Sequence, residues 1–251
     1  MTRTFVGEFT KIRTTGMVLG ILGVAVGLSL LSLLLGGGGV AKGYYSSVAN
    51  QRALVGAAGW AGTAAMLLGA IGMTSEERHK TLTPSLLAVP NRAVFVLGKA
   101  LAYAVTGAVM ALVTLIACVP AFWFRVNDAG AKILLSGGDW VGLTLGVMIY
   151  AALASIIGVG LGCIVRNQIA LVAGILIWFI ILEALLLVQT QSLAKYTPGG
   201  LGAAIGGPGA VGVSAYTVQG LAIGAAIGAY LVYVVVILGG GVVALRRRDV
   251  S

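Results

Sequence analysis

Six long apolar stretches, separated by short segments rich in charged or turn-forming residues, constrain this 251-residue chain more than any other feature. The hydrocarbon core of a bilayer is about 30 Å thick, and about 20 apolar residues in a helix cross it. Only 9% of the residues are charged, against about 25% in soluble domains. The pattern predicts an all-α polytopic membrane protein, a single domain with six transmembrane helices. The expected spans are 16–35, 53–73, 94–124, 141–165, 168–190 and 220–245.

The basic residues predict the orientation of these spans. Six spans place both termini on one side of the membrane. If that side is the cytoplasm, the inner segments hold eleven Lys and Arg residues and the outer segments hold five. Cytoplasmic segments of membrane proteins are enriched in Lys and Arg, so we expect both termini and residues 74–93 in the cytoplasm. The net charge of +9 then reflects topology and contact with membrane lipid, and no nucleic acid is expected as a partner.

Residues 2–14 have the pattern of a short amphipathic helix. Phe5, Phe9 and Ile12 recur at spacings that place them on one helical face. Lys11 lies on the other face and Arg13 at its margin. We therefore predict an interfacial helix at the inner surface of the membrane.

The connection between the second and third spans, residues 74–93, is the most charged part of the chain. Within it, Thr83 can cap a helix whose first residue is Pro84, and Pro90 disfavours helical geometry in the residue before it. The short helix between them carries Leu86 and Leu87 and is too short to be stable alone in water. We expect the ends of its own spans, or a partner protein, to hold it. Its charged neighbours are Glu76, Glu77, Arg78, Lys80 and Arg92.

Two further features lie toward the C-terminus. The outer segment 191–219 is too broken by Gly and Pro for a span and too apolar for a solvated loop. It predicts re-entrant or interfacial helices covered by protein. Glu183 is the only acidic residue well inside a predicted span, where a charge costs about 2.5–3.5 kcal/mol. It is either a substrate-path or gating residue or the partner in an interhelical hydrogen bond.

Several short motifs carry a family resemblance. An E-x-T-K-x-R-T-T segment at 8–15 precedes two spans, and S-E-E-R-H-K-T-L at 75–82, P-N-R at 90–92 and G-K at 98–99 follow them. With the run 177–186 around Glu183, they resemble the membrane subunits of bacterial ABC exporters of the type-2 permease family. The resemblance implies a permease subunit in the bacterial plasma (inner) membrane that exports a lipophilic or peptide-like substrate.

The resemblance also implies partners: a second permease copy, in a homo- or heterodimer, and separate ABC ATPase subunits. The chain has no G-x-x-x-x-G-K-[ST] phosphate-binding loop, so we expect it to be no enzyme itself and to need no cofactor. ATP and Mg would be bound by the ATPase partner. The residues that the resemblance assigns to ATPase coupling are Glu76, Glu77, Arg78, Leu86, Leu87 and Arg92.

Other functions compete with this one. An intramembrane metalloprotease would need several metal ligands at membrane depth; the chain has one histidine, His79, in a predicted loop, and no metal site is expected. An ATP-independent transporter or channel usually places several ionisable groups in its spans, and Glu183 alone is predicted there. A non-transporting immunity or sensor subunit remains open.

Overall fold

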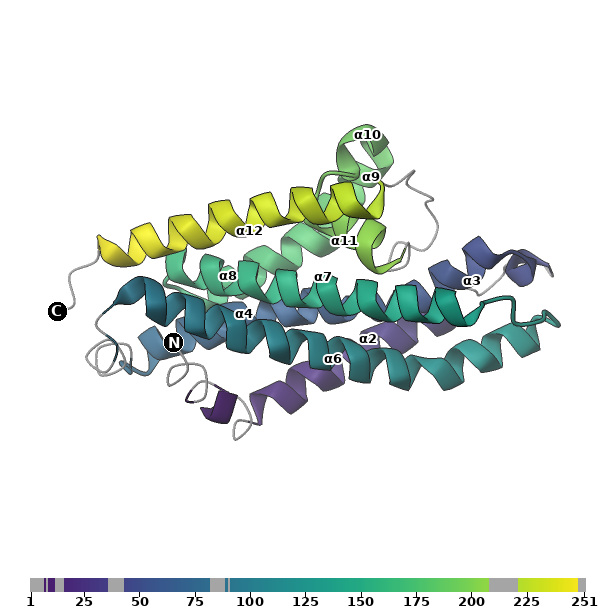
Figure 1. The fold of residues 1–251 in the computed structure, drawn as a ribbon, viewed down its shortest axis with the longest axis horizontal. Helices are drawn as coiled ribbons and strands as arrows, with labels where there is room; N and C mark the ends of the chain where they lie inside the picture. Colours follow the sequence, from purple (N-terminus) through teal and green to yellow (C-terminus); the bar gives the residue numbers. More distant parts are fainter. Residues whose placement is uncertain are drawn as a thin grey trace.

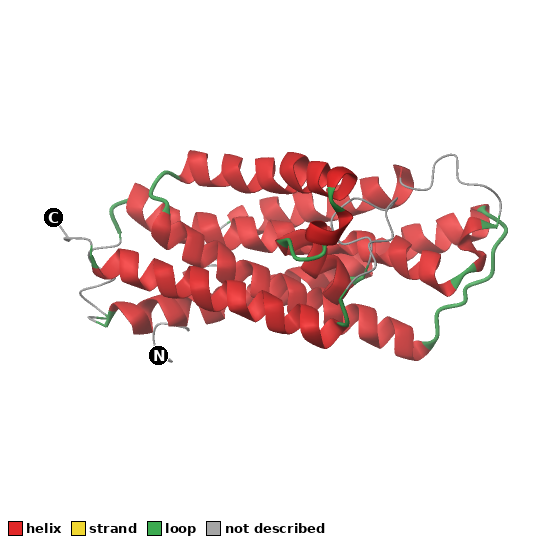
Figure 2. Cartoon of the chain, turned by 90° about the horizontal axis from the view of Figure 1, so that it is seen from above, coloured by secondary structure: helices red, strands yellow, loops and turns green. Residues whose placement is uncertain are grey.

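The computed structural model describes residues 7, 9–11, 16–35, 43–81, 89, 91–207 and 221–247. Within these residues all regular structure is helical, without a strand (Figures 1 and 2). Six helical stretches are long and apolar enough to cross a membrane. The predicted all-α polytopic membrane fold is therefore confirmed.

The six stretches are α2 (Met17–Leu35); α3, η2 and α4 (Val48–Val55, Gly56–Gly59, Trp60–Arg78); α6 (Arg92–Asp128); α7 (Gly137–Ile164); α8, η3 and α9 (Gln168–Ile177, Trp178–Leu182, Glu183–Gln189); and α12 (Ile223–Arg246). Shorter helices among the described residues include η1 (Tyr44–Ser46), α10 (Gln191–Ala194) and α11 (Pro198–Gly206). The long helices lie side by side and alternate in direction (Figure 1). We call the end at which α4 and α12 finish and α6 begins the inner end, and the opposite end the outer end.

Helix α7 is the centre of the bundle, because α4, α6, α11 and α12 all pack against it. Small residues make this possible. A Cβ atom at Gly158 of α7 would overlap the carbonyl oxygen of Met66 in α4, and one at Gly69 of α4 would overlap that of Ser155 in α7. In lipid, where burial of apolar surface does not drive association, such close backbone approach is a main source of helix packing.

Helix α6 is continuous through Pro120, a residue type that often kinks or ends a helix. Its 37 residues extend about 55 Å at 1.5 Å per residue, well beyond the hydrocarbon core. The N-cap of α6 is Asn91, whose side chain accepts the N–H groups of Ala93 and Val94. The helix therefore starts at a well-formed cap near the inner end and is longer than a membrane crossing requires.

At the outer end, the buried side chain of Gln51 joins three segments. Its Nε2 donates to the carbonyl oxygens of Tyr45 at 2.8 Å and Lys132 at 2.7 Å, and its Oε1 accepts the N–H of Leu134 at 2.9 Å. One side chain thus connects α3, the segment before it and the connection between α6 and α7.

Replacing Gln51 by Leu is expected to lower the free energy of unfolding by about 1–2 kcal/mol, because backbone groups that it satisfies lose their partner. Asn50→Leu is the matched control, since that side chain makes one exposed bond, 2.6 Å to the carbonyl of Tyr44. Reversible unfolding in mixed micelles measures both. Equal losses for the two variants would contradict the role of Gln51.

The segment before α12 contains the expected short helices, as far as it is described, through residue 207. Thr197 caps α11 by accepting the N–H of Gly200 at 3.1 Å, and Pro198 occupies the first turn. The buried face of α11 packs against α7 and α12. Residues 208–219 of the predicted segment lie outside the described residues.

Candidate functional site

The end of α4 differs from the expected loop. Residues 74–78 belong to α4, so the connection to α6 begins at His79 rather than Thr74. The Thr81 N–H bonds to the carbonyl of Glu76 at 2.9 Å and the Lys80 N–H to that of Glu77 at 3.1 Å. This is a Schellman cap, in which Lys80, with φ 55°, takes the left-handed position that glycine usually occupies.

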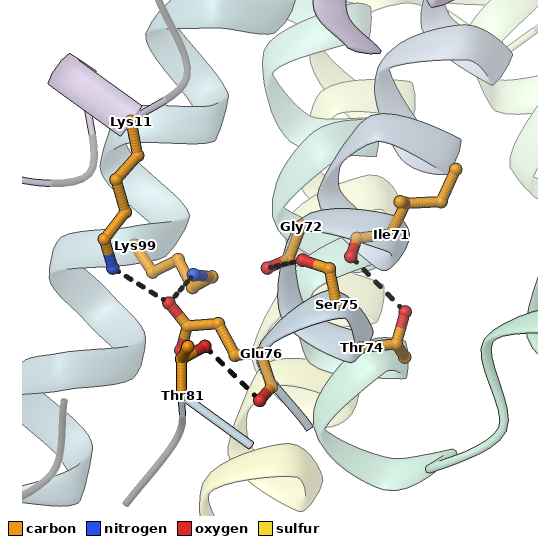
Figure 3. A network of polar contacts seen from close by, with 8 residues as sticks. All are labelled: Lys11, Ile71, Gly72, Thr74, Ser75, Glu76, Thr81 and Lys99. Atoms are coloured by element: carbon orange, nitrogen blue, oxygen red, sulfur yellow. Dashed lines mark hydrogen bonds and ion pairs between the residues drawn. The ribbon is translucent and has the colours of Figure 1, made fainter. Parts of the chain in front are cut away.

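Three charged side chains meet at this end of α4 (Figure 3). The Glu76 Oε1 atom lies 2.9 Å from Lys99 Nζ of α6 and 3.2 Å from Lys11 Nζ of the N-terminal segment. The side chains of Lys99 and Glu76 are 1% and 7% exposed, whereas that of Lys11 is 57% exposed. We call Glu76, Lys99 and Lys11 the inner charge cluster. It joins three segments through one carboxylate oxygen.

Aromatic rings complete the surroundings of Lys99. Its Nζ lies 5.7 Å from the ring centroids of both Phe95 and Tyr103, one turn away on either side along α6. Rings at this distance attract a cation, which offsets part of the cost of burying the ammonium group. Lys99, near the start of a predicted span, is thus a buried residue of α6.

The structure also corrects the expected surroundings of two residues assigned to ATPase coupling. Glu76 does not belong to the connection between the spans, because it lies in α4 and is buried in the inner charge cluster. The Arg92 guanidinium donates to the carbonyl oxygen of Leu245, and at 3.2 Å to that of Arg246, at the end of α12. A cation there satisfies terminal carbonyls and complements the helix dipole. Arg92 therefore joins the start of α6 to the end of α12.

The other predicted coupling residues are only partly described. Arg78 is exposed and Glu77 is half-buried, both in the last turn of α4. Leu86 and Leu87 lie outside the described residues. In the predicted interfacial helix, residues 7 and 9–11 are helical and Phe9 is 40% exposed. Phe5, Ile12 and Arg13 lie outside the described residues.

Glu183 lies deep in the bundle, in a second polar region. It directly follows η3, a single π-helical turn, an irregularity frequent at functional sites. The side chain is buried, and its Oε1 accepts the N–H of Gly199 at the start of α11 at 2.7 Å. The expected interhelical hydrogen bond is present, though its donor is a backbone N–H and not a side chain.

Sequence reasoning missed Lys99 as the partner of Glu76, and it missed two buried tyrosines, Tyr150 and Tyr230, near Glu183. A lysine at the start of an apolar stretch looks like a flanking charge, and a tyrosine within a span carries no positional signal.

A scan of protein-family models and a search of curated proteins found no match to this chain.

Proposed function

We propose that this chain is the membrane-spanning permease subunit of an ATP-driven exporter. It would pair with a second permease copy and with separate ABC ATPase subunits that bind the inner end. The substrate would be a lipophilic or peptide-like molecule. This proposal rests on the resemblance of the sequence motifs and on one structural observation, the inner charge cluster.

The inner charge cluster supports the proposal because of what it joins. A motor protein that pushes on residues 79–91 from the cytoplasm acts directly on the ends of α4 and α6. Since Glu76 and Lys99 form a buried ion pair 2.9 Å apart, the ends of these two helices are tied together. Lys11 ties the N-terminal segment to the same carboxylate. A push at this point would therefore move three segments as one unit.

The contact of Arg92 extends this unit to a fourth segment. Its bonds to the last carbonyls of α12 join the start of α6 to the final span. Concerted rocking of packed helices is a known form of conformational switching. In this scheme the exposed residues around Arg78 would contact the ATPase, and the buried residues would transmit the movement.

The proposal predicts that Leu86→Asp abolishes binding of the ATPase, because a charge replaces an apolar contact of the short helix predicted between Thr83 and Pro90. The measurement is co-purification of the tagged chain with the ABC ATPase encoded nearest to its gene. Leu134→Asp is the matched control: Leu134 is an exposed leucine outside the helices, at the outer end, and its replacement should leave binding unchanged. Full binding by the Leu86 variant would contradict docking at residues 79–91.

A further inference from the structure

The carboxyl group of Glu183 is the only buried acid of the outer half of the described bundle. Gly199 is so close that a Cβ atom there would overlap the carboxylate. Because Gly199 is in the first turn of α11, the positive end of that helix dipole faces the carboxyl group. None of the described Lys, Arg or His residues forms an ion pair with Glu183. Its charge is therefore compensated by the start of α11 rather than by a basic side chain.

Four buried polar atoms in this region have no hydrogen-bond partner among the described residues: Glu183 Oε2, Tyr150 Oη, Tyr230 Oη and Thr63 Oγ1. Each of these residues is at most 3% exposed. The Thr197 hydroxyl is near Glu183, but it donates its hydrogen to the carbonyl of Ala194 at 2.7 Å. Unpaired polar atoms at this depth are costly and call for an explanation.

The four atoms belong to one cluster rather than to scattered sites. The Glu183 carboxylate abuts Gly199 and the Tyr150 phenol abuts Gly202, one turn farther along the same face of α11. The rings of Tyr150 and Tyr230 pack edge to face at 5.8 Å. Gly62, the neighbour of Thr63 in α4, packs against the Tyr150 ring. The cluster thus joins α4, α7, α9, α11 and α12.

The packing limits what can bind there. Cβ atoms at Gly62 and Gly202 would overlap opposite edges of the Tyr150 ring, so the ring is enclosed on two sides and a large ligand has no space. A site with one acid, three hydroxyls and no basic residue attracts a cation. A proton is the smallest cation and needs no cavity.

We propose that Glu183 is a reversible proton-binding site within the bundle, and that its protonation state controls how firmly α11 is held. This inference is independent of any ATPase. Protonation forms one O–H bond at Oε2 with a proton from solvent, and no other covalent bond changes. The bond from Gly199 then loses its charge assistance, which roughly halves the strength of such bonds.

Few other charges lie around the cluster. Among the described residues, the titratable groups nearest to Glu183 are Tyr150 on α7 and Tyr230 on α12, while Tyr233 of α12 donates its hydroxyl to the carbonyl of Tyr196 at 3.1 Å. Between α10 and α11, the Lys195 ammonium lies over the ring of Tyr196 at 5.1 Å. The described surroundings of the Glu183 carboxyl group are therefore the start of α11 and neutral side chains, without a basic partner.

Infrared difference spectra of the full chain in lipid nanodiscs, recorded as the pH is varied, test the inference. The wild type should show a buried carboxylic-acid band that disappears as the pH rises. Glu183→Gln should lose this band, whereas Asp128→Asn, a change at an exposed acid near the end of α6, should keep it. Identical spectra of wild type and Glu183→Gln would overturn the proposal.

Hydrogen exchange of residues 197–206 provides the second readout. In the wild type, the protection of the α11 amides, relative to their intrinsic exchange rates, should fall as the pH falls through the titration of the infrared band. In Glu183→Gln the protection of the α11 amides, relative to their intrinsic exchange rates, should be low at every pH. If that variant does not fold, Tyr230→Phe replaces it, and the midpoint of the infrared titration should move. An unchanged midpoint in Tyr230→Phe would overturn the proposal. So would a wild type in which the protection of the α11 amides does not vary with pH.

Discussion

Replacing Lys99 by Met is expected to lower the free energy of unfolding by about 3–5 kcal/mol, the cost of leaving a buried charge without its partner. Glu76 would keep only Lys11, whose side chain is 57% exposed and already hydrated. The apolar surroundings that suit the Lys99 stem would accept Met without a large change in volume. The loss therefore comes from the charge on Glu76 and not from packing. Reversible unfolding in mixed micelles measures it.

The double variant Lys99→Met with Glu76→Gln separates charge from shape. With both charges removed, most of the lost stability should return, because neutral groups replace a buried ion pair at little cost. Lys11→Gln alone should have a small effect, since exposed pairs contribute about 0–1 kcal/mol. Additive losses in the double variant would show that Lys99 and Glu76 act independently.

Replacing Gly158 by Ala is expected to cost about 3 kcal/mol, the upper end of the measured range for overpacking. The added Cβ atom meets the backbone of Met66 rather than a flexible side chain, so α4 and α7 have to separate. Gly228→Ala is the control, because nothing lies within 4 Å of a Cβ atom there. Ala is also the better helix former by about 1 kcal/mol, so that variant should be neutral or more stable.

Thermal unfolding and the fraction of monodisperse protein compare these two variants. If Gly158→Ala and Gly228→Ala behave alike, close contact between α4 and α7 does not stabilise the bundle. The comparison is informative because the sequence treats both positions alike: each glycine belongs to a small-xxx-small pair, with Gly162 and Gly224 respectively.

The spans could be predicted because hydropathy reports directly on the solvent of a helix. The tight turn between α7 and α8 is also readable from Asn167, whose side chain caps α8 through the N–H groups of Ile169 and Ala170. The end of α4 could not be predicted. It depends on Lys80 adopting a left-handed conformation, and no residue pattern indicates that for a lysine.

The inner charge cluster was beyond sequence reasoning for a different reason. Glu76 and Lys99 are 23 residues apart in the chain and come from different helices, so no local periodicity relates them. In the sequence, both resemble charges that flank a span. The cluster around Glu183 likewise depends on the short helix α11 returning into the bundle, which the glycines of that segment permit but do not specify.

ATP hydrolysis by the ABC ATPase encoded nearest to this gene, reconstituted in liposomes with and without this chain, tests the proposed function most directly. The account predicts that the wild-type chain binds the ATPase and changes its rate of hydrolysis. It further predicts that Lys11→Gln binds equally well but changes the rate less, because one connection of the inner charge cluster is lost. An ATPase that neither binds this chain nor responds to it would contradict the assignment as a permease subunit.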